Sequence, residues 1–306
     1  MYVLVKHSNA VLSYLAPETL SRVSRLDLVA RLVVEGFITG LHRSPYHGFS
    51  VEFSEHRPYM PGDPLRDLDW KAYAKSDRLY VKQYEEETNL KAYILCDVSG
   101  SMNFCAGAPM SKYRYAICLS AALAYLMLRQ RDAVGLMLFR DAIESYVPPR
   151  SVQSHLQTLL KEMDRVQPEE DTHMAPAFHD LAERIGRRGL IIVLSDLLDD
   201  SQEVLRGLRH FRHRGHEVVV FHLLDPRELD LQFDQETRFF DLEQPGQIIA
   251  TQPWHVRREY GQIMEEMVQT YRRGCAEAHI DYVLVDTSTP FDQALSRYLV
   301  QRKKMR

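Results

Sequence analysis

Apolar runs and amphipathic stretches alternate along the chain from about residue 90 onward. Short, continuously apolar runs predict buried strands at residues 93–96, 133–139, 190–194, 218–224 and 282–285, with a short neighbour at 143–147. Apolar residues at helical spacing predict helices at residues 111–129, 151–166, 175–185, 201–214, 254–278 and 291–301. This repeated order predicts an α/β fold with a mainly parallel sheet and helices on both faces.

Two segments depart from this alternation. Residues 238–251 predict a hairpin, with two strands around a Pro245-Gly246 turn. The first 89 residues predict a helix at 18–38, then strands at 48–53 and 79–84 joined by a connection rich in Pro, Gly and Asp. We therefore expect residues 1–89 to hold an amino-terminal helix and a small β-rich subdomain that includes the 238–251 hairpin. Residues 90–306 would form the main α/β domain.

The segment LKAYILCDVSGSM, residues 90–102, leads from a predicted buried strand into Asp97, Ser99 and Ser101. One carboxylate and two hydroxyls would then lie at the carboxyl end of a strand, where open α/β sheets place their ligands. Oxygen donors without His or Cys suit a hard cation such as Mg²⁺ or Mn²⁺. Asp and Ser are also ordinary turn and helix-cap residues, so a purely structural turn is the alternative.

This segment resembles the start of a von Willebrand factor A domain, in which Asp-x-Ser-x-Ser opens a metal-ion-dependent adhesion site. In that family, a Thr on a later loop and an Asp after a fourth strand complete the site. Thr172 and Asp196 match those two positions here. The resemblance implies that hydroxyls ligate the ion directly, from Ser99, Ser101 and Thr172. It also implies that Asp97 and Asp196 hold Mg²⁺ or Mn²⁺ largely through water, which suits the reluctance of Mg²⁺ to lose its hydration.

Residues 42–89 are dense in polar side chains of unlike kinds and resemble the signature of a bacterial family, domain-of-unknown-function family 58. Matching elements include Glu52-Phe53, Pro61-Gly62-Asp63 and Asp69-Trp70-Lys71. In that family a von Willebrand A-like domain follows the signature directly. Relatives are associated with MoxR-type AAA+ ATPases, as adaptors in assembling or remodelling complexes, so the resemblance implies such a partner. Taken without the resemblance, residues 42–89 could form a structural ion-pair network, a binding surface or a nuclease-like metal site.

Composition and charge give no indication of a nucleic-acid-binding or membrane-spanning protein. The chain has 306 residues, 45% of them hydrophobic and 26% charged, and a formal net charge of −4, which gives no reason to expect nucleic acid as a partner. The longest apolar stretch, residues 116–128, falls well short of the roughly 20 residues that cross a bilayer. With no apparent signal peptide and four cysteines lacking CxxC spacing, we expect a cytoplasmic protein with reduced thiols.

Together these features predict a non-enzymatic interaction module that binds an acidic side chain of a partner protein through its metal site. The alternative is a metal-dependent hydrolase, a phosphoesterase or nuclease, with Asp199 and His173 as candidate bases. Ser99 occupies the position where haloacid-dehalogenase-type phosphatases usually place a second Asp, which disfavours aspartyl-phosphate chemistry. His210 and His213 could share a helix face and bind a transition metal, or simply belong to a solvated basic face.

Overall fold

The computed structural model describes residues 25–31, 33–34, 56–58, 80–82, 91–168, 174–186, 188–240, 248–291 and 293–296. The chain divides into two compact units, one of residues 1–40 and 90–306 and the other of residues 41–89. In the second unit, β1 (His56–Pro58) pairs antiparallel with β2 (Tyr80–Lys82), which lies within the predicted strand at 79–84. The predicted strand at 48–53 lies outside the described residues. The expected subdomain of residues 42–89 and the 238–251 hairpin stays a prediction.

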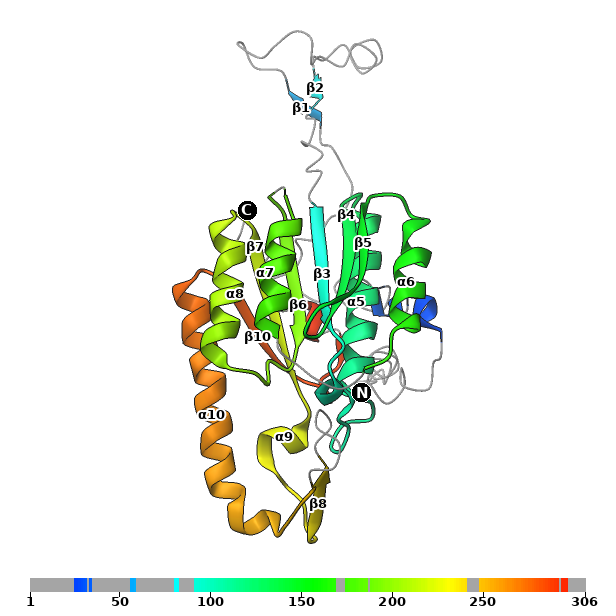
Figure 1. Ribbon diagram of the computed structural model, residues 1–306. Coiled ribbons are helices and arrows are strands. Elements are labelled where there is room, and N and C mark those ends of the chain that lie inside the picture. Colours follow the sequence, from blue (N-terminus) through cyan, green and yellow to red (C-terminus); the bar gives the residue numbers. More distant parts are fainter. Residues whose placement is uncertain are drawn as a thin grey trace, which may run out of the picture. The chain divides into compact units, whose positions relative to one another are not determined.

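The larger unit contains a six-stranded sheet in the order β10-β7-β6-β3-β4-β5 (Figure 1). Its strands are β3 (Lys91–Asp97), β4 (Ala133–Phe139), β5 (Ile143–Arg150), β6 (Leu190–Ser195), β7 (Glu217–Leu224) and β10 (Asp281–Asp286). All neighbours are parallel except β5, which pairs antiparallel with β4 at one edge. The inner strands are buried along nearly their whole length, because helices cover both faces, and this explains their continuously apolar sequences.

Helices cover the two faces of the sheet. On one face, α7 (Met174–Arg184), α8 (Ser201–His213) and α10 (Pro253–Glu277) share a core with the strands, centred on Phe178, Phe211 and Tyr271. On the other face, α5 (Lys112–Arg129) packs against the inner strands, with α6 (His155–Arg165) beside it (Figure 1). The predicted α/β class with a mainly parallel sheet is therefore confirmed.

Several boundaries differ from the predicted ones. α6 begins at His155 with Ser154 at its N-cap, rather than at 151, because β5 continues to Arg150 and a turn follows. A five-residue helix, α9 (Pro226–Asp230), was not predicted. The hairpin forms from β8 (Thr237–Phe240) and β9 (Ile248–Thr251), and its turn lies outside the described residues. A short 3₁₀ helix, η2 (Gly100–Asn103), follows β3.

The chain ends are described in part. At the amino end, residues 26–31 and 33–34 are helical and bury Leu26, Val29 and Val33. At the carboxyl end, residue 291 and residues 293–296 are helical. Across the described ranges, no helix has both the length and the apolar character needed to cross a membrane.

Two buried histidines should make the fold sensitive to acid. Burial lowers the pKa of His216 below its ordinary value of 6.5, and burial lowers the pKa of His222 to about 4. As the pH falls below 6.5 the unfolded chain binds protons that the folded chain does not, so stability is lost in that direction. The free energy of unfolding should fall by up to about 1.4 kcal/mol per pH unit for each histidine.

Urea unfolding at pH 7.5 and about pH 5.5 measures the histidine contribution as the difference between wild type and a variant, because Asp97, whose pKa burial raises to about 7, contributes in the opposite direction. The free energy of unfolding of His216→Asn should fall less than that of wild type, because asparagine does not titrate. Its amide oxygen can still accept from the Gly189 N–H, as His216 Nδ1 does at 3.2 Å. His213→Asn, which replaces an exposed histidine, is the control, and its free energy of unfolding should change with pH as that of wild type does. Equal losses in wild type and His216→Asn would contradict the assignment.

Candidate functional site

The sheet order places the candidate site at a topological switch point. From β3 the chain proceeds to β4 on one side and later returns to β6 on the other, and open α/β sheets bind their ligands beyond the carboxyl ends of two such strands. Asp97 is the last residue of β3, and Asp196 directly follows β6. Both carboxylates are fully buried. The structure thus brings together two of the predicted site residues that are far apart in the sequence.

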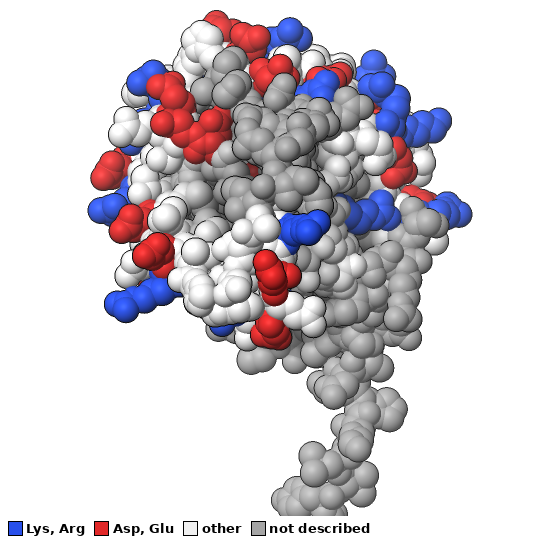
Figure 2. Space-filling view, turned by 60° about the horizontal axis from the view of Figure 1, so that its bottom comes forward, with Lys and Arg blue, Asp and Glu red and all other residues white. Residues whose placement is uncertain are grey.

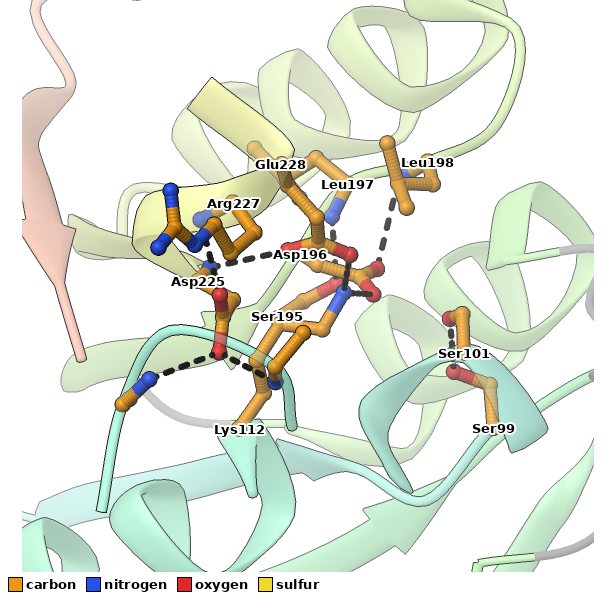
Figure 3. Close-up of polar contacts among 12 residues, drawn as sticks. Ser99, Ser101, Lys112, Ser195, Asp196, Leu197, Leu198, Asp225, Arg227 and Glu228 are labelled. Carbon is orange, nitrogen blue, oxygen red and sulfur yellow. Dashed lines mark hydrogen bonds and ion pairs between the residues drawn. The ribbon is translucent and has the colours of Figure 1, made fainter. Parts of the chain in front are cut away.

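The Asp97 carboxylate is held by two hydrogen bonds from the protein. The Ser99 N–H donates to Oδ1 at 2.9 Å, and the Ser195 hydroxyl donates to Oδ2 at 2.6 Å. The hydroxyl oxygens of Ser99 and Ser101 lie 3.0 Å apart on the turn that follows β3 (Figure 3). Asp97 therefore has a fixed orientation, and the Ser99 and Ser101 hydroxyls lie together on the turn that directly follows it. Ser195 was not among the predicted site residues, because its contact with Asp97 joins two strands that are far apart in the sequence.

A buried lysine joins Asp196 to a third carboxylate. The ammonium of Lys112, the first residue of α5, donates to Asp196 Oδ2 at 2.6 Å and to Glu228 Oε1 at 2.5 Å (Figure 3). The Lys112 side chain has no exposed surface. Its role was not predicted, although the sequence carries a signal: a cation is unfavourable in the first turn of a helix unless carboxylates compensate it.

Asp225 fastens the loop after η2 to the start of α9. Its carboxylate accepts hydrogen bonds from three consecutive backbone N–H groups, those of residues 106, 107 and 108, at 2.8 to 3.2 Å. It also caps α9 by accepting from the Arg227 N–H at 2.8 Å, and Glu228 completes a capping box (Figure 3). One side of the site is therefore closed by α9 and this loop, two segments more than 110 residues apart.

The charges of the site are unbalanced. Burial, together with the neighbouring Asp196 carboxylate, raises the pKa of Asp97 to about 7. Burial works against the Lys112 ammonium, but Asp196 and Glu228 outweigh it and raise the pKa of that lysine. With every group ionised, Asp97, Asp196, Glu228 and the Lys112 ammonium together carry a net charge of −2 in a largely buried region, where the Glu228 side chain is 11% exposed. A divalent cation would balance this charge.

The donor set fits a hard cation. Hydroxyl and carboxylate oxygens surround the switch point, and oxygen ligands are those that Mg²⁺ prefers. Asp196 already accepts hydrogen bonds from Lys112 through Oδ2 and from the Leu198 N–H through Oδ1, the latter at 3.3 Å. This suits the expectation that Asp196 would contact the ion through water. Among the described residues, no three His, Cys, Asp or Glu side chains are placed so that they alone could hold a metal ion, so serine hydroxyls would have to contribute. Thr172 lies outside the described residues.

The candidate bases of the hydrolase alternative give it no support. The Asp199 carboxylate accepts hydrogen bonds from the backbone N–H groups of Met174, at 2.8 Å, and Asp200, at 2.7 Å. Asp200 in turn caps α8 by accepting from the N–H groups of Gln202 and Glu203. Asp199 is thus engaged at the start of α7, and His173 lies outside the described residues.

The surface at this end of the molecule carries charges of both signs. Figure 2 turns this end toward the viewer, and acidic and basic side chains both border it. The described part of this face shows no continuous basic patch of the kind that tracks a nucleic-acid backbone.

The chain is similar to a protein family and to individual proteins whose functions are described as unknown or uncharacterized. A family described as "Protein of unknown function DUF58" matches residues 55–269. The "Uncharacterized protein Rv1480" of Mycobacterium tuberculosis (strain ATCC 25618 / H37Rv) is 28% identical over 218 residues, which cover 70% of this chain and 68% of that protein. The "Uncharacterized protein Mb1516" of Mycobacterium bovis gives the same values.

Solved structures also align with much of the chain. The conserved hypothetical protein BatB from Bacteroides thetaiotaomicron is 19% identical with a TM-score of 0.48, covering 70% of this chain and 99% of that one. The VWA domain of SpRpn10 is 10% identical with a TM-score of 0.40, covering 67% of this chain and 93% of that one.

Proposed function

The chain belongs to the DUF58 family, and on that premise we propose that it is a metal-dependent protein-interaction module without enzymatic activity. Its larger unit has a von Willebrand A-like α/β fold, with five parallel strands, one antiparallel edge strand and helices on both faces. This fold is typical of protein-interaction modules. The observation that carries the proposal is the largely buried group of three carboxylates and one ammonium beside two serine hydroxyls at the switch point.

In the proposed mechanism Ser99, Ser101 and Thr172 ligate the ion, while Asp97 and Asp196 hold it through water. When bound, Mg²⁺ or Mn²⁺ would supply a positive field and an open coordination position for a partner's carboxylate. The protein fixes the donors beforehand: Ser195 and the Ser99 N–H orient Asp97, as described above. Lys112 holds Asp196 in place through the hydrogen bond to Oδ2. The donors therefore need little rearrangement, which favours binding.

The proposed partner is a protein that presents an acidic side chain, and a MoxR-type AAA+ ATPase is the first candidate. Family resemblance supports this choice, with a role in assembling or remodelling complexes. A cytoplasmic location, where such an ATPase could be reached, belongs to the same proposal. The engagement of Asp199 with the start of α7 supports a binding role over hydrolysis, because each oxygen of that carboxylate already accepts a backbone hydrogen bond.

Calorimetric titration of metal-stripped protein with Mg²⁺ and Mn²⁺ tests the metal site. Wild type should bind one ion, and Ser99→Ala should bind at least tenfold more weakly, because a hydroxyl ligand is lost. Ser151→Ala, at an exposed serine outside the site, is the matched control and should bind as wild type does. Equal affinity in Ser99→Ala and wild type would overturn the proposed site.

A capture experiment tests the partner. A MoxR-type AAA+ ATPase should be retained by wild type in Mg²⁺, and lost in EDTA or with Ser99→Ala. Capture that persists in EDTA would refute metal-dependent docking. Assays with phosphoester and nuclease substrates in Mn²⁺ address the hydrolase alternative, since turnover by wild type that Asp97→Ala abolishes would replace the binding proposal with an enzymatic one.

A further inference from the structure

Helices α7 and α8 pack closely on the face of the sheet that carries Phe178. A Cβ added at Gly207 of α8 would lie 2.8 Å from the Phe178 Cβ of α7, a separation that only glycine allows. His179 is the neighbour of Phe178, and His210 lies about one turn beyond Gly207 on α8. The close helix contact therefore brings two histidines from different helices together at the surface.

The two imidazole rings face each other through the same atom. Nδ1 of His179 and Nδ1 of His210 are 3.2 Å apart, and the ring centroids are 4.9 Å apart with the planes tilted by 35°. The sequence had suggested His210 and His213 as a possible pair, but His179 is the histidine that His210 contacts. The His210 side chain is 25% exposed, so a dissolved ion can reach the pair.

Glu183 and Arg214 surround His210 on its other side. Glu183 lies one turn after His179 on α7, and its Oε1 is 3.5 Å from His210 Nε2. Both carboxylate oxygens of Glu183 accept from Arg214 Nη1 at 3.2 Å, which holds the carboxylate in position. A carboxylate facing Nε2 favours the tautomer with its proton there, and this tautomer leaves the lone pair on Nδ1, toward His179.

We propose that His179 and His210 form a two-histidine clamp for a borderline divalent transition metal, of which Zn²⁺ is the representative. Two nitrogens that each lie about 2.0–2.1 Å from a tetrahedral Zn²⁺ are about 3.3–3.4 Å apart, close to the observed separation. Glu183 then orients one ligand, as carboxylates do behind metal-bound histidines. This site is separate from the proposed Mg²⁺ site and differs in chemistry, with nitrogen instead of oxygen donors.

The clamp supplies two ligands, and water or a group from a partner completes the coordination. Within the described part of the chain, no third His, Cys, Asp or Glu joins the pair to form a closed metal site. An open site of this kind binds its ion less tightly than a structural zinc site with four protein ligands. We therefore expect reversible binding that does not alter the fold.

Calorimetric titration with Zn²⁺ tests the clamp, in a Cys105→Ser background because Cys105 is an exposed free thiol that could also bind Zn²⁺. One ion per chain should bind, and His179→Asn and His210→Asn should each weaken binding at least tenfold. His213→Asn is the matched control, an exposed histidine on the same helix, and should leave the affinity unchanged. Ser99→Ala should also leave it unchanged.

Electron paramagnetic resonance of the Cu²⁺-loaded protein gives a second measurement. Nitrogen hyperfine splitting from two imidazoles should appear in the Cys105→Ser protein and be reduced in either clamp variant. The absence of saturable Zn²⁺ binding would overturn the clamp, and so would equal affinity in His179→Asn, His210→Asn and His213→Asn. Because the variants lie outside the switch point, loss of the clamp and loss of the proposed Mg²⁺ site are distinguishable.

Discussion

Lys112→Met should lower the free energy of unfolding by about 3–5 kcal/mol, because it removes the only ammonium that contacts two buried carboxylates in the described site. Methionine has similar length and can fill the space, so the loss reports charge more than packing. Asp196, which is fully buried, and Glu228, whose side chain is only 11% exposed, would remain without a cation. Urea unfolding of both proteins at neutral pH and without added divalent ions measures the effect.

Two further variants separate this effect from a general response to losing a lysine. Lys161→Met, at an exposed lysine of α6, should change stability by less than about 0.5 kcal/mol. Adding Glu228→Gln to Lys112→Met should restore part of the lost stability, because one of the two orphaned charges is removed. If Lys112→Met were as stable as wild type, the buried ion pairs described for Asp196 and Glu228 would be wrong.

Gly189→Ala should destabilise the fold by about 3 kcal/mol, near the upper end of the usual cost of overpacking. A Cβ at Gly189 would lie 2.3 Å from the backbone oxygen of Lys91, the first residue of β3. The backbone at Gly189 has little room to shift, because its N–H donates to His216 and its oxygen accepts from the Glu217 N–H. The midpoint of thermal unfolding should fall accordingly.

Gly186→Ala provides the matched control. It lies three residues earlier in the same connection, and a Cβ there would meet nothing within 4 Å. This variant should be as stable as wild type or slightly more stable, because alanine restricts the unfolded chain. A similar loss in both variants would point to the flexibility of the connection instead of the contact with Lys91.

The fold was predictable where complete burial of a strand requires a continuous run of apolar residues. β4 has the bounds that its apolar run predicts. Helices cover both faces of this strand, and the sequence becomes polar where the strand leaves the core. α9 was missed because five residues are too few to show helical periodicity, although Asp225-Pro226 followed by Glu228 is a capping pattern. The start of α6 was misplaced because Ser151 and Ser154 are equally plausible caps in sequence.

The site was predictable only where its residues follow one another along the chain. Asp97, Ser99 and Ser101 lie at the end of β3 and in the turn after it, and Asp196 directly follows the apolar strand β6. The partners of Lys112 lie 84 and 116 residues away, so no local pattern connects them. Their meeting depends on the order of β3, β6 and β7 in the sheet, which hydrophobic periodicity does not specify.

The antiparallel strand β5 has a consequence for assembly. It forms one edge of the sheet, and an uncovered edge can recruit strands from other molecules. Two consecutive prolines near its end, Pro148 and Pro149, have no backbone N–H to offer an added strand, and charged residues such as Glu144 and Arg150 flank them. This border resists sheet extension, so fibre-like association of molecules through the β5 edge is disfavoured.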